Sequence, residues 1–314
     1  MKQKSAKPDY RVRNWAQYNK SLIQRGSVTL WISPDVERTW FAEPCGANGR
    51  PAVYSDAAMT AVACIRSVFR LPLRMTQGFL ESLFARIGSP LPVPNYTTIA
   101  RRIGLLRVDF SPLPTDRPID IVIDSTGIKV YGEGEWKVRK HGVGKRRTWR
   151  KLHLAVDAET QKIVAADVTE NDVHDCSVFE ELLSQIPGTI GSIAADGAYD
   201  TRWCYFLAAE RGAKSLISPR ENARRWTGDS GGERLRNANL DRIAEIGCKP
   251  WKIESGYHRR SLAETAMFRM KTVFGDRVAS RRMDRQKAEL LMRARILNVF
   301  TQLGMPDSYR VSSG

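Results

Sequence analysis

The sequence has few of the residues that build disulfide frameworks and zinc sites. Its 314 residues include five cysteines and four histidines. The cysteines are scattered, odd in number and never spaced as Cys-x-x-Cys. This pattern argues against a disulfide scaffold or a structural zinc site and indicates a reducing compartment. The cysteines are Cys45, Cys64, Cys176, Cys204 and Cys248.

Long apolar runs are also missing. No stretch approaches the ~18 apolar residues that a membrane span needs. The charged opening from Met1 to Arg13 has no apolar segment, so we expect no secretory signal. There is neither an internal repeat nor a long low-complexity segment. Because 42% of the residues are hydrophobic, the chain can bury one large core or two smaller ones, which argues against disorder.

Negative charge is scarce relative to positive charge. The chain has 34 acidic and 50 basic residues, which gives a formal net charge of +16. Such a surplus favours an anionic partner, either nucleic acid or an acidic membrane surface. Charge alone does not choose between them, but no basic amphipathic helix with an exposed apolar face stands out, which disfavours the membrane.

The first part of the chain, residues 1–112, predicts a basic helical region. The segment Val28–Ile32 has the pattern of a short strand, and the turn formers within residues 35–55 predict a loop. Apolar residues at helical spacing then predict three helices. With Arg101 and Arg102 on the last helix, the unit at about 56–106 resembles a helix-turn-helix, and an ordinary helical subdomain is the alternative. The helices are expected at about 56–69 (capped by Asp56), 76–87 and 96–106.

After a proline-rich boundary at residues 113–118, the pattern changes to that of an α/β domain. Apolar runs with turn formers between them predict a mixed five-stranded sheet flanked by helices. The polar, basic and glycine-rich residues 219–250 predict an insertion or long loop. The expected strands are 119–124, 151–156, 162–168, 192–195 and 214–218. The expected helices are 175–185, 201–211, 257–274 and 284–303.

Two aspartates follow apolar strand segments. Asp124 ends the first predicted strand, and Asp196 follows the fourth and precedes Gly197, a residue that allows close backbone approach. Ligands gather at such strand ends in open α/β sheets. A single strand-end aspartate more often only caps a turn, but two of them at core strands favour a functional site.

A third acid, Glu264, belongs to a Tyr-Arg-Glu-Lys array. If residues 257–274 form one α-helix, its members fall inside a stripe about 60° wide, because successive residues are ~100° apart. The alternative is a solvated face in which Arg260 and Glu264 form an ordinary i,i+4 pair. That alternative explains the charges but not the tyrosine. The array is Tyr257, Arg260, Glu264 and Lys271.

Together these residues resemble the DDE transposases of bacterial insertion sequences, most nearly the insertion sequence five family. The resemblance covers most of the chain and is strongest from about 119 to 300. Two further stretches are similar to that family: residues 14–32 (NWAQYNKSLIQRGSVTLWI) and residues 130–142 (VYGEGEWKVRKHG). The motifs that carry it are Asp124 in Asp-Ser-Thr-Gly, Asp196 in Ala-Asp-Gly-Ala-Tyr-Asp, and the array of Tyr257, Arg260, Glu264 and Lys271.

The resemblance implies an RNase H-like catalytic domain over residues 113–305. A small insertion at about 219–255 would precede the last catalytic helix, residues 1–112 would bind DNA, and residues 306–314 would be a tail. The implied catalytic residues are Asp124, Asp196 and Glu264. Three carboxylates at one sheet edge repel one another unless cations lie between them, and Mg²⁺ prefers oxygen ligands.

The implied cofactor is a pair of Mg²⁺ ions held by the same three acids, with Asp124 shared, and Mn²⁺ as a substitute. The implied reaction is nicking of the element's ends to free a 3′-OH, followed by transesterification of that 3′-OH into target DNA. No general-base histidine is required. We therefore expect structural or phosphate-facing roles for His141, His153, His174 and His258.

The resemblance also implies that Tyr257, Arg260 and Lys271 contact phosphates beside the scissile bond. Between Lys137 and Lys151, eight basic residues and no acid favour a DNA clamp over a solvated hairpin tip. Trp226 or Trp251 would hold a flipped base, with core packing as the more frequent role of such residues. The clamp residues expected to bind DNA are Lys137, Arg139, Lys140, Lys145, Arg146, Arg147 and Arg150.

The expected partners are terminal inverted repeats and target DNA, bound by a homodimer in the synapse. The expected location is the bacterial cytoplasm, at the nucleoid, with neither a membrane nor a small-molecule substrate. Basic residues of the last helices, such as Arg281 and Arg285, would add a surface for DNA or a partner subunit. Two alternatives remain open: an RNase H-like metal nuclease without strand transfer, and an inactive DNA-binding relative.

Overall fold

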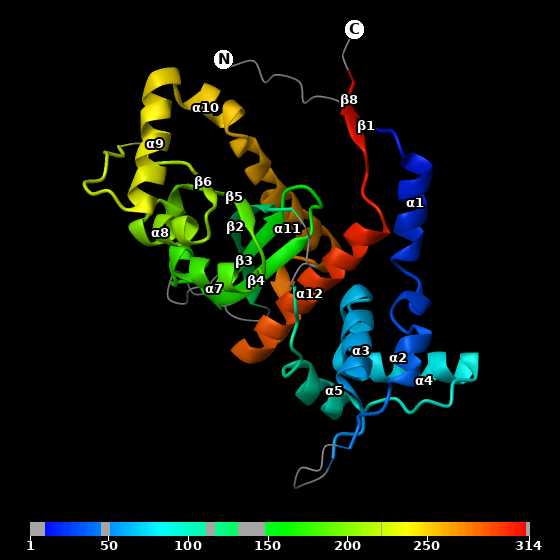
Figure 1. Cartoon of the computed structure of the whole chain (residues 1–314). Helices are drawn as coiled ribbons and strands as arrows, with labels where there is room; N and C mark the ends of the chain where they lie inside the picture. The colour runs from blue at the N-terminus through cyan, green and yellow to red at the C-terminus, as the bar shows by residue number, and fades with distance from the viewer. Residues whose placement is uncertain (1–9, 45–50, 111–116, 131–147, 221, 312–314) are drawn as a thin grey trace, which may run out of the picture.

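The computed structural model describes residues 10–44, 51–110, 117–130, 148–220 and 222–311. The N-terminal helices form a lobe beside a sheet that is covered by helices on both faces (Figure 1). The helices of this N-terminal lobe are α1 (Trp15–Gln24), α2 (Pro34–Arg38), α3 (Asp56–Val68), α4 (Leu73–Ile87) and α5 (Tyr96–Ile103).

Local capping explains where these helices begin and corrects several predicted boundaries. Ser55, rather than Asp56, caps α3, and its Oγ accepts a hydrogen bond from the Ala58 N–H at 3.0 Å. The predicted strand at Val28–Ile32 is wrong: Val28–Leu30 form a 3₁₀ turn, η1. The predicted loop at 35–55 opens with a helix, because Ser33 caps α2 and a proline occupies its first position.

The main sheet has six strands rather than the five predicted. Five follow the order β4-β3-β2-β5-β6, and the two-residue β7 pairs with the far end of β2. The first three strands in sequence are antiparallel, and the next two run parallel to β2. This order and these directions are the RNase H-like arrangement that was expected. The strands are β2 (Ile119–Val130), β3 (Trp149–Asp157), β4 (Ile163–Glu170), β5 (Ile190–Ala195), β6 (Lys214–Ile217) and β7 (Arg277–Val278).

Alternation along β2 divides the core between the two faces of the sheet. Odd-numbered residues such as Ile121 and Ile123 pack against α7 (Phe179–Ser184) and α8 (Arg202–Glu210). Even-numbered residues such as Val122 and Ile128 pack against α11 (Ser261–Phe274) and α12 (Met283–Leu303). The core on the α11 and α12 side of the sheet continues into α3 to α5. The N-terminal lobe and the sheet therefore share buried side chains, although the predicted boundary at residues 113–118 lies between them in the chain.

The segment predicted as an insertion or long loop contains two helices, α9 (Gly231–Ile246) and α10 (Cys248–Glu254). Ser230 and Glu233 form a reciprocal capping box at the start of α9. This Ser-x-x-Glu signal was readable in the sequence, but the helix is mostly polar and lacks a strong apolar stripe. The predicted tail at 306–314 includes β8 (Ser308–Arg310), which pairs with β1 (Tyr10–Val12) near both termini (Figure 1).

Candidate active site

Asp124 lies in the middle of β2 and not at its end, as the sequence predicted. The strand continues to Val130 because its second half pairs with β3, up to Lys129 opposite Trp149. The parallel neighbour β5, in contrast, ends at Ala195. The sheet therefore opens beside Asp124, where one strand stops and the other continues.

The register of this parallel pair brings two acids together. Val122 lies opposite Ala194, so two further residues along each chain lead to Asp124 and Asp196. Asp196 caps the short 3₁₀ turn η3 (Gly197–Tyr199), and its Oδ1 accepts a hydrogen bond from the Ala198 N–H at 2.9 Å. The turn fixes the Asp196 backbone at the point where β5 ends.

The Tyr-Arg-Glu-Lys array does not lie on one continuous α-helix. Tyr257–Arg260 form a 3₁₀ turn, η4, and the α-helix α11 begins at Ser261. The 100° spacing assumed for the whole array is therefore wrong for its first turn. Glu264 and Lys271 are nevertheless on α11, and the array still faces the even-numbered side of β2.

Arg260 joins two of the three acids. One guanidinium nitrogen donates to Asp124 Oδ2 at 2.8 Å and another to Glu264 Oε1 at 2.5 Å. Farther along α11, Lys271 Nζ donates to Thr126 Oγ1 at 2.6 Å. Because Asp124 and Thr126 are alternate residues of β2, the basic side chains of η4 and α11 lie along the same face of that strand.

Tyr257 is the first residue of η4, the turn that ends at Arg260. Its side chain is buried and packs on Trp251, with ring centroids 5.7 Å apart, and Lys252 Nζ lies 5.2 Å from its ring centroid. Burial raises the pKa of Tyr257, and Asp196 and Asp124 act in the same direction. The phenol therefore stays protonated at neutral pH.

The electrostatics of Asp124 reflect the crowding of three carboxylates. Burial raises its pKa above the ordinary range, while the Ser125 N–H, 2.9 Å from Oδ1, and the Arg260 guanidinium oppose that rise. Asp196 and Glu264 raise it further. Asp124 is therefore electrostatically coupled to both other acids; its side chain is 16% exposed and that of Glu264 is 54% exposed.

The donor set suits a hard divalent cation. It consists of carboxylate oxygens that repel one another, and the structure already brings a positive guanidinium between Asp124 and Glu264. Among the described residues, no three acidic, histidine or cysteine side chains are gathered closely enough to hold one ion. The residues that would hold a cation here are Asp124, Asp196 and Glu264. Because Arg260 contacts two of these acids, a bound cation would replace those contacts.

Sequence reasoning missed a support on the opposite face of the sheet. Ser125, next to Asp124, donates to Asp175 Oδ2 at 2.9 Å, and Lys151 Nζ donates to Asp175 Oδ1 at 3.0 Å and to the Val173 carbonyl at 2.8 Å. Asp175 opens the 3₁₀ turn η2 (Asp175–Val178), where α-helix was predicted. No sequence pattern links these residues, because they come from β2, β3 and the turn η2 and meet only in the folded chain.

The other residues predicted to bind DNA lie in three different settings. Arg150 Nε donates to Gln286 Oε1 at 2.6 Å at the base of the basic hairpin. Trp226 is half-buried against Tyr205, 5.4 Å between centroids, with the Arg236 guanidinium 4.0 Å from its ring. The following predicted residues lie outside the described part of the chain: Lys137, Arg139, Lys140, His141, Lys145, Arg146 and Arg147.

Of the remaining histidines, His153 is fully buried and its Nε2 lies 2.9 Å from Thr169 Oγ1, whereas His174 and His258 are exposed. None of these three contributes to a described metal-binding cluster. Within the same part of the chain, no helix is both long and apolar enough to span a membrane.

Comparison with known protein families identifies the class of protein. A family model described as a transposase DDE domain matches residues 116–299, and a second model with the same description matches residues 23–133. The first match covers more than half of the chain, so this protein belongs to the DDE transposases, a family of DNA-transposing nucleases. Its partner is accordingly DNA. The narrower assignment to the insertion sequence five family stays a prediction.

Two individual comparisons are weaker. A solved structure of the piggyBac transposase synaptic complex with hairpin DNA matches 89% of this chain and 75% of that chain, with 10% sequence identity and a TM-score of 0.39. Mitochondrial fission process protein 1 of Danio rerio is 48% identical over 46 residues, which make up 15% of this chain and 27% of that protein. The chain thus spans about a quarter of that relative, whose role does not transfer.

Proposed function

We propose that this transposase binds the terminal inverted repeats of an insertion sequence, nicks their ends to free a 3′-OH, and joins that 3′-OH to target DNA. The observation that supports this most directly is the parallel register of β2 and β5, which brings Asp124 beside Asp196. Glu264 is connected to the same point through Arg260. These three acids are the proposed catalytic residues.

Asp124, Asp196 and Glu264 would hold two Mg²⁺ ions, or Mn²⁺ in their place. When bound, such ions supply positive charge to the oxygens that gain negative charge in an in-line displacement. Arg260, once released from the two acids, would pair with a phosphate beside the scissile bond. Lys271 and Tyr257 border the same face of β2 and would hold the DNA backbone in register without reading bases.

The synapsis of two ends implies a homodimer on DNA. We further place the protein in the insertion sequence five family and at the bacterial nucleoid, where the DNA of such an element lies. Short inverted repeats that bound the gene, with direct target repeats outside them, would support both statements. Their absence from the flanking DNA would contradict them.

A strand-transfer assay tests the proposal. The full chain is incubated with a pre-nicked duplex carrying the terminal repeat, a target plasmid and Mg²⁺, and joined products are separated by electrophoresis. We expect joined product with the native chain and none with Asp124→Ala, which should still bind the repeat. Hydrolysis without joining would instead identify an RNase H-like nuclease, and binding without cleavage by the native chain would identify an inactive relative.

A further inference from the structure

A cavity lined by arginines lies at the junction of the N-terminal lobe and the last helix. Its volume is about 250 Å³, and it opens to solvent between α3, α5 and the loop that joins β7 to α12. Four of its lining residues are arginines, and no described residue that lines it is acidic. The arginines are Arg66, Arg281, Arg282 and Arg285.

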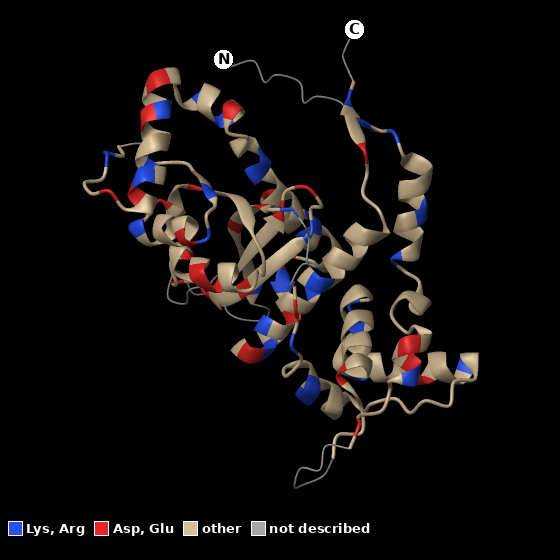
Figure 2. Ribbon diagram, viewed as in Figure 1, with Lys and Arg blue, Asp and Glu red and all other residues tan. Residues whose placement is uncertain are grey.

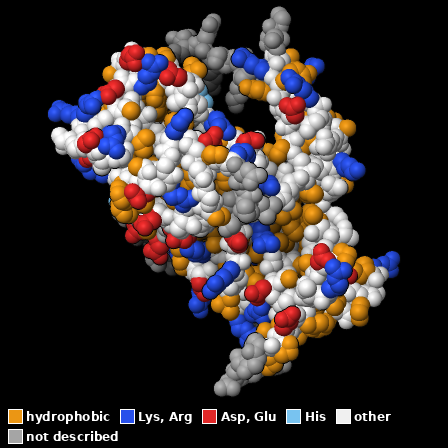
Figure 3. Space-filling view, viewed as in Figure 1, with side chains coloured by type: hydrophobic (Ala, Val, Ile, Leu, Met, Phe, Trp, Pro, Cys, Tyr) orange, Lys and Arg blue, Asp and Glu red, His pale blue; other side chains and the backbone are white. Residues whose placement is uncertain are grey.

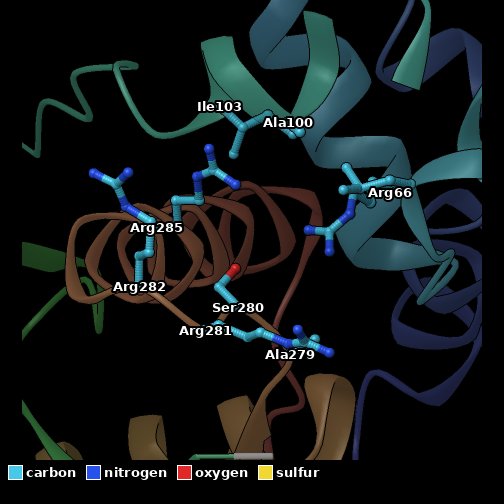
Figure 4. A pocket seen from close by; sticks show the side chains of 9 residues that line it. Arg66, Ala100, Ile103, Ala279, Ser280, Arg281, Arg282 and Arg285 are labelled. Atoms are coloured by element: carbon cyan, nitrogen blue, oxygen red, sulfur yellow. The ribbon is translucent and has the colours of Figure 1, made fainter. Parts of the chain in front are cut away.

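Three of these arginines form no ion pair with a described residue, although Asp284 also attracts Arg285 at longer range. Arg282 pairs with Asp284 at 3.1 Å, and in Figure 4 its side chain lies beside that of Arg285, on the side away from Arg66. For Arg66, Arg281 and Arg285, the described residues provide no carboxylate within ion-pair distance. The Nε of Arg66 is buried without a hydrogen-bond partner. Buried donors of this kind are normally satisfied, and no described group supplies a partner for this one.

The loop that carries Arg281 is held rigidly. Glu289 accepts hydrogen bonds from the backbone N–H groups of Ala279 and Ser280, at 3.1 and 3.0 Å. Gln286 Nε2 donates to the carbonyls of Ser280 and Arg281, at 3.0 and 3.1 Å. The cavity is therefore preformed, which lowers the entropic cost of binding a ligand there.

Both the size and the surroundings of the cavity favour part of a polymer over a free small molecule. Its volume lies below the roughly 300–1,000 Å³ of typical small-molecule sites. Ala100 and Ile103 of α5 form one wall, and the exposed Arg101 lies on the same helix. Gln286, which holds the loop between β7 and α12, also accepts a hydrogen bond from Arg150 near the start of β3.

Basic side chains continue outward from the cavity. In the space-filling view, Lys and Arg side chains gather over the start of α12 and the neighbouring α5 (Figure 3). The ribbon view coloured by charge shows basic segments on the same two helices (Figure 2). The partial positive charge of the α12 N-terminus has the same sign. A duplex that lies along α5 would bring one of its phosphates to the cavity.

We propose that Arg66, Arg281 and Arg285 form a binding site for one phosphate of the DNA backbone, separate from the acidic site and beside α5. The site would fix the position of the duplex relative to the catalytic sheet, because phosphate contacts set register while bases supply sequence information. This inference rests on the proposed function, in that it takes DNA as the ligand.

The test measures binding of the full chain to a fluorescent duplex by anisotropy over a range of salt concentrations. We expect Arg66→Gln/Arg285→Gln to weaken binding roughly tenfold and to reduce the slope of log K against log salt by about 0.9, the value for one phosphate. Arg281→Gln, at an exposed position whose loss should not disturb folding, should weaken binding in the same direction. The matched control is Arg282→Gln, which removes the same charge from an arginine already paired with Asp284.

The outcomes separate this inference from the proposed function. Unchanged affinity and salt slope in the double variant, or an equal loss in Arg282→Gln, would overturn the phosphate site alone. Failure of the native chain to bind any duplex would overturn both proposals. Thermal melting with inorganic phosphate distinguishes the other source of the anion: if phosphate stabilises the native chain but not the double variant, and DNA binding is equal in both, the cavity takes a free anion and not DNA.

Discussion

Two contacts between an aspartate and an arginine differ in almost every physical respect. Asp200 and Arg236 are both buried, with side chains 2% and 4% exposed, and two nitrogens of Arg236 contact the two carboxylate oxygens at 2.6 and 3.2 Å. Asp124 and Arg260 are partly exposed and share a single contact at 2.8 Å. Arg260 also divides its donors between Asp124 and Glu264.

Asp200 follows Asp196 of the candidate site by only four residues, yet it belongs to a buried structural pair. Around Asp200, the Arg220 N–H and the Arg224 carbonyl complete the hydrogen bonds of the pair, so the segment before α9 is anchored to the sheet. Around Asp124, the positive charge comes from one shared guanidinium. A buried and satisfied pair holds the fold together, whereas a partly buried and divided one can be exchanged for another cation.

The largest expected effect is a loss of DNA cleavage when the Asp124–Arg260 contact is removed. Asp124→Asn should reduce DNA cleavage roughly 10³-fold or more, because it removes a proposed metal ligand and a charge that no neighbour replaces. The unfolding free energy should change by less than about 1 kcal/mol, because the substitution also relieves repulsion from Asp196 and Glu264. Cleavage on a terminal-repeat duplex and urea melts measure the two effects. A large loss of stability would show that the Asp124–Arg260 contact is structural after all.

The buried contact should show the opposite profile. Asp200→Asn is expected to lower the unfolding free energy by about 3–5 kcal/mol, because Arg236 is left buried without a full counter-charge. The matched control is Asp241→Asn, which breaks an exposed pair with Arg225 nearby and should cost less than about 1 kcal/mol. Urea melts of the two variants test the comparison, and equal losses would contradict it.

Arg260→Gln should move two measurements in opposite directions. Cleavage is expected to fall about 10²-fold, because a phosphate partner beside the scissile bond is lost. Binding of Mn²⁺ alone should become tighter, because Asp124 and Glu264 no longer have a guanidinium to displace. Calorimetric titration with Mn²⁺ measures the second effect in the absence of DNA. Weaker Mn²⁺ binding would mean that Arg260 organises the acids and does not compete for them.

The smallest effect concerns a buried group that has no charged partner in contact. Burial lowers the pKa of His153 below its ordinary value. The unfolded chain therefore binds this proton more readily, and stability should fall as pH drops below about 6.5. In His153→Gln, whose amide can still reach Thr169, the decline between pH 7 and 5.5 should be shallower by about 1 kcal/mol. Urea melts at both pH values measure it, and parallel declines would exclude His153 as the cause.

Much of the catalytic region could be predicted from the sequence. Apolar runs identified all five main strands. The two aspartates were singled out as strand-end residues, and Glu264 with its array through spacing and resemblance to a known family; their catalytic roles stay a prediction. What the sequence could not show was that β2 continues past Asp124, because the continuation depends on pairing between Lys129 and Trp149, which is a contact between strands. The 3₁₀ turn at Tyr257 was missed for a related reason, since residue spacing does not distinguish it from the first turn of an α-helix.

The N-terminal lobe and the insertion were less predictable. The strand expected at Val28–Ile32 finds no partner strand and folds as a 3₁₀ turn that packs against the main core. The polar helix α9 is held by the buried Asp200–Arg236 pair, and nothing in the surrounding sequence reveals which acid faces which arginine. Helices that depend on long-range polar contacts leave little apolar periodicity to read.

The sequence by itself determined which kinds of residue the candidate site contains, three acids and an interleaved basic array. It also determined the excess of arginine and lysine in the chain. Hydrophobic alternation and motif spacing carry that information, because both are local along the chain. Only the tertiary structure decided how the charges meet. Strand register brought Asp124 beside Asp196, packing of η4 and α11 along β2 put Arg260 between Asp124 and Glu264, and the meeting of α3 with α12 left Arg66 and Arg285 without an ion pair to any described carboxylate. Such pairings depend on distance in space, which residue spacing alone does not encode.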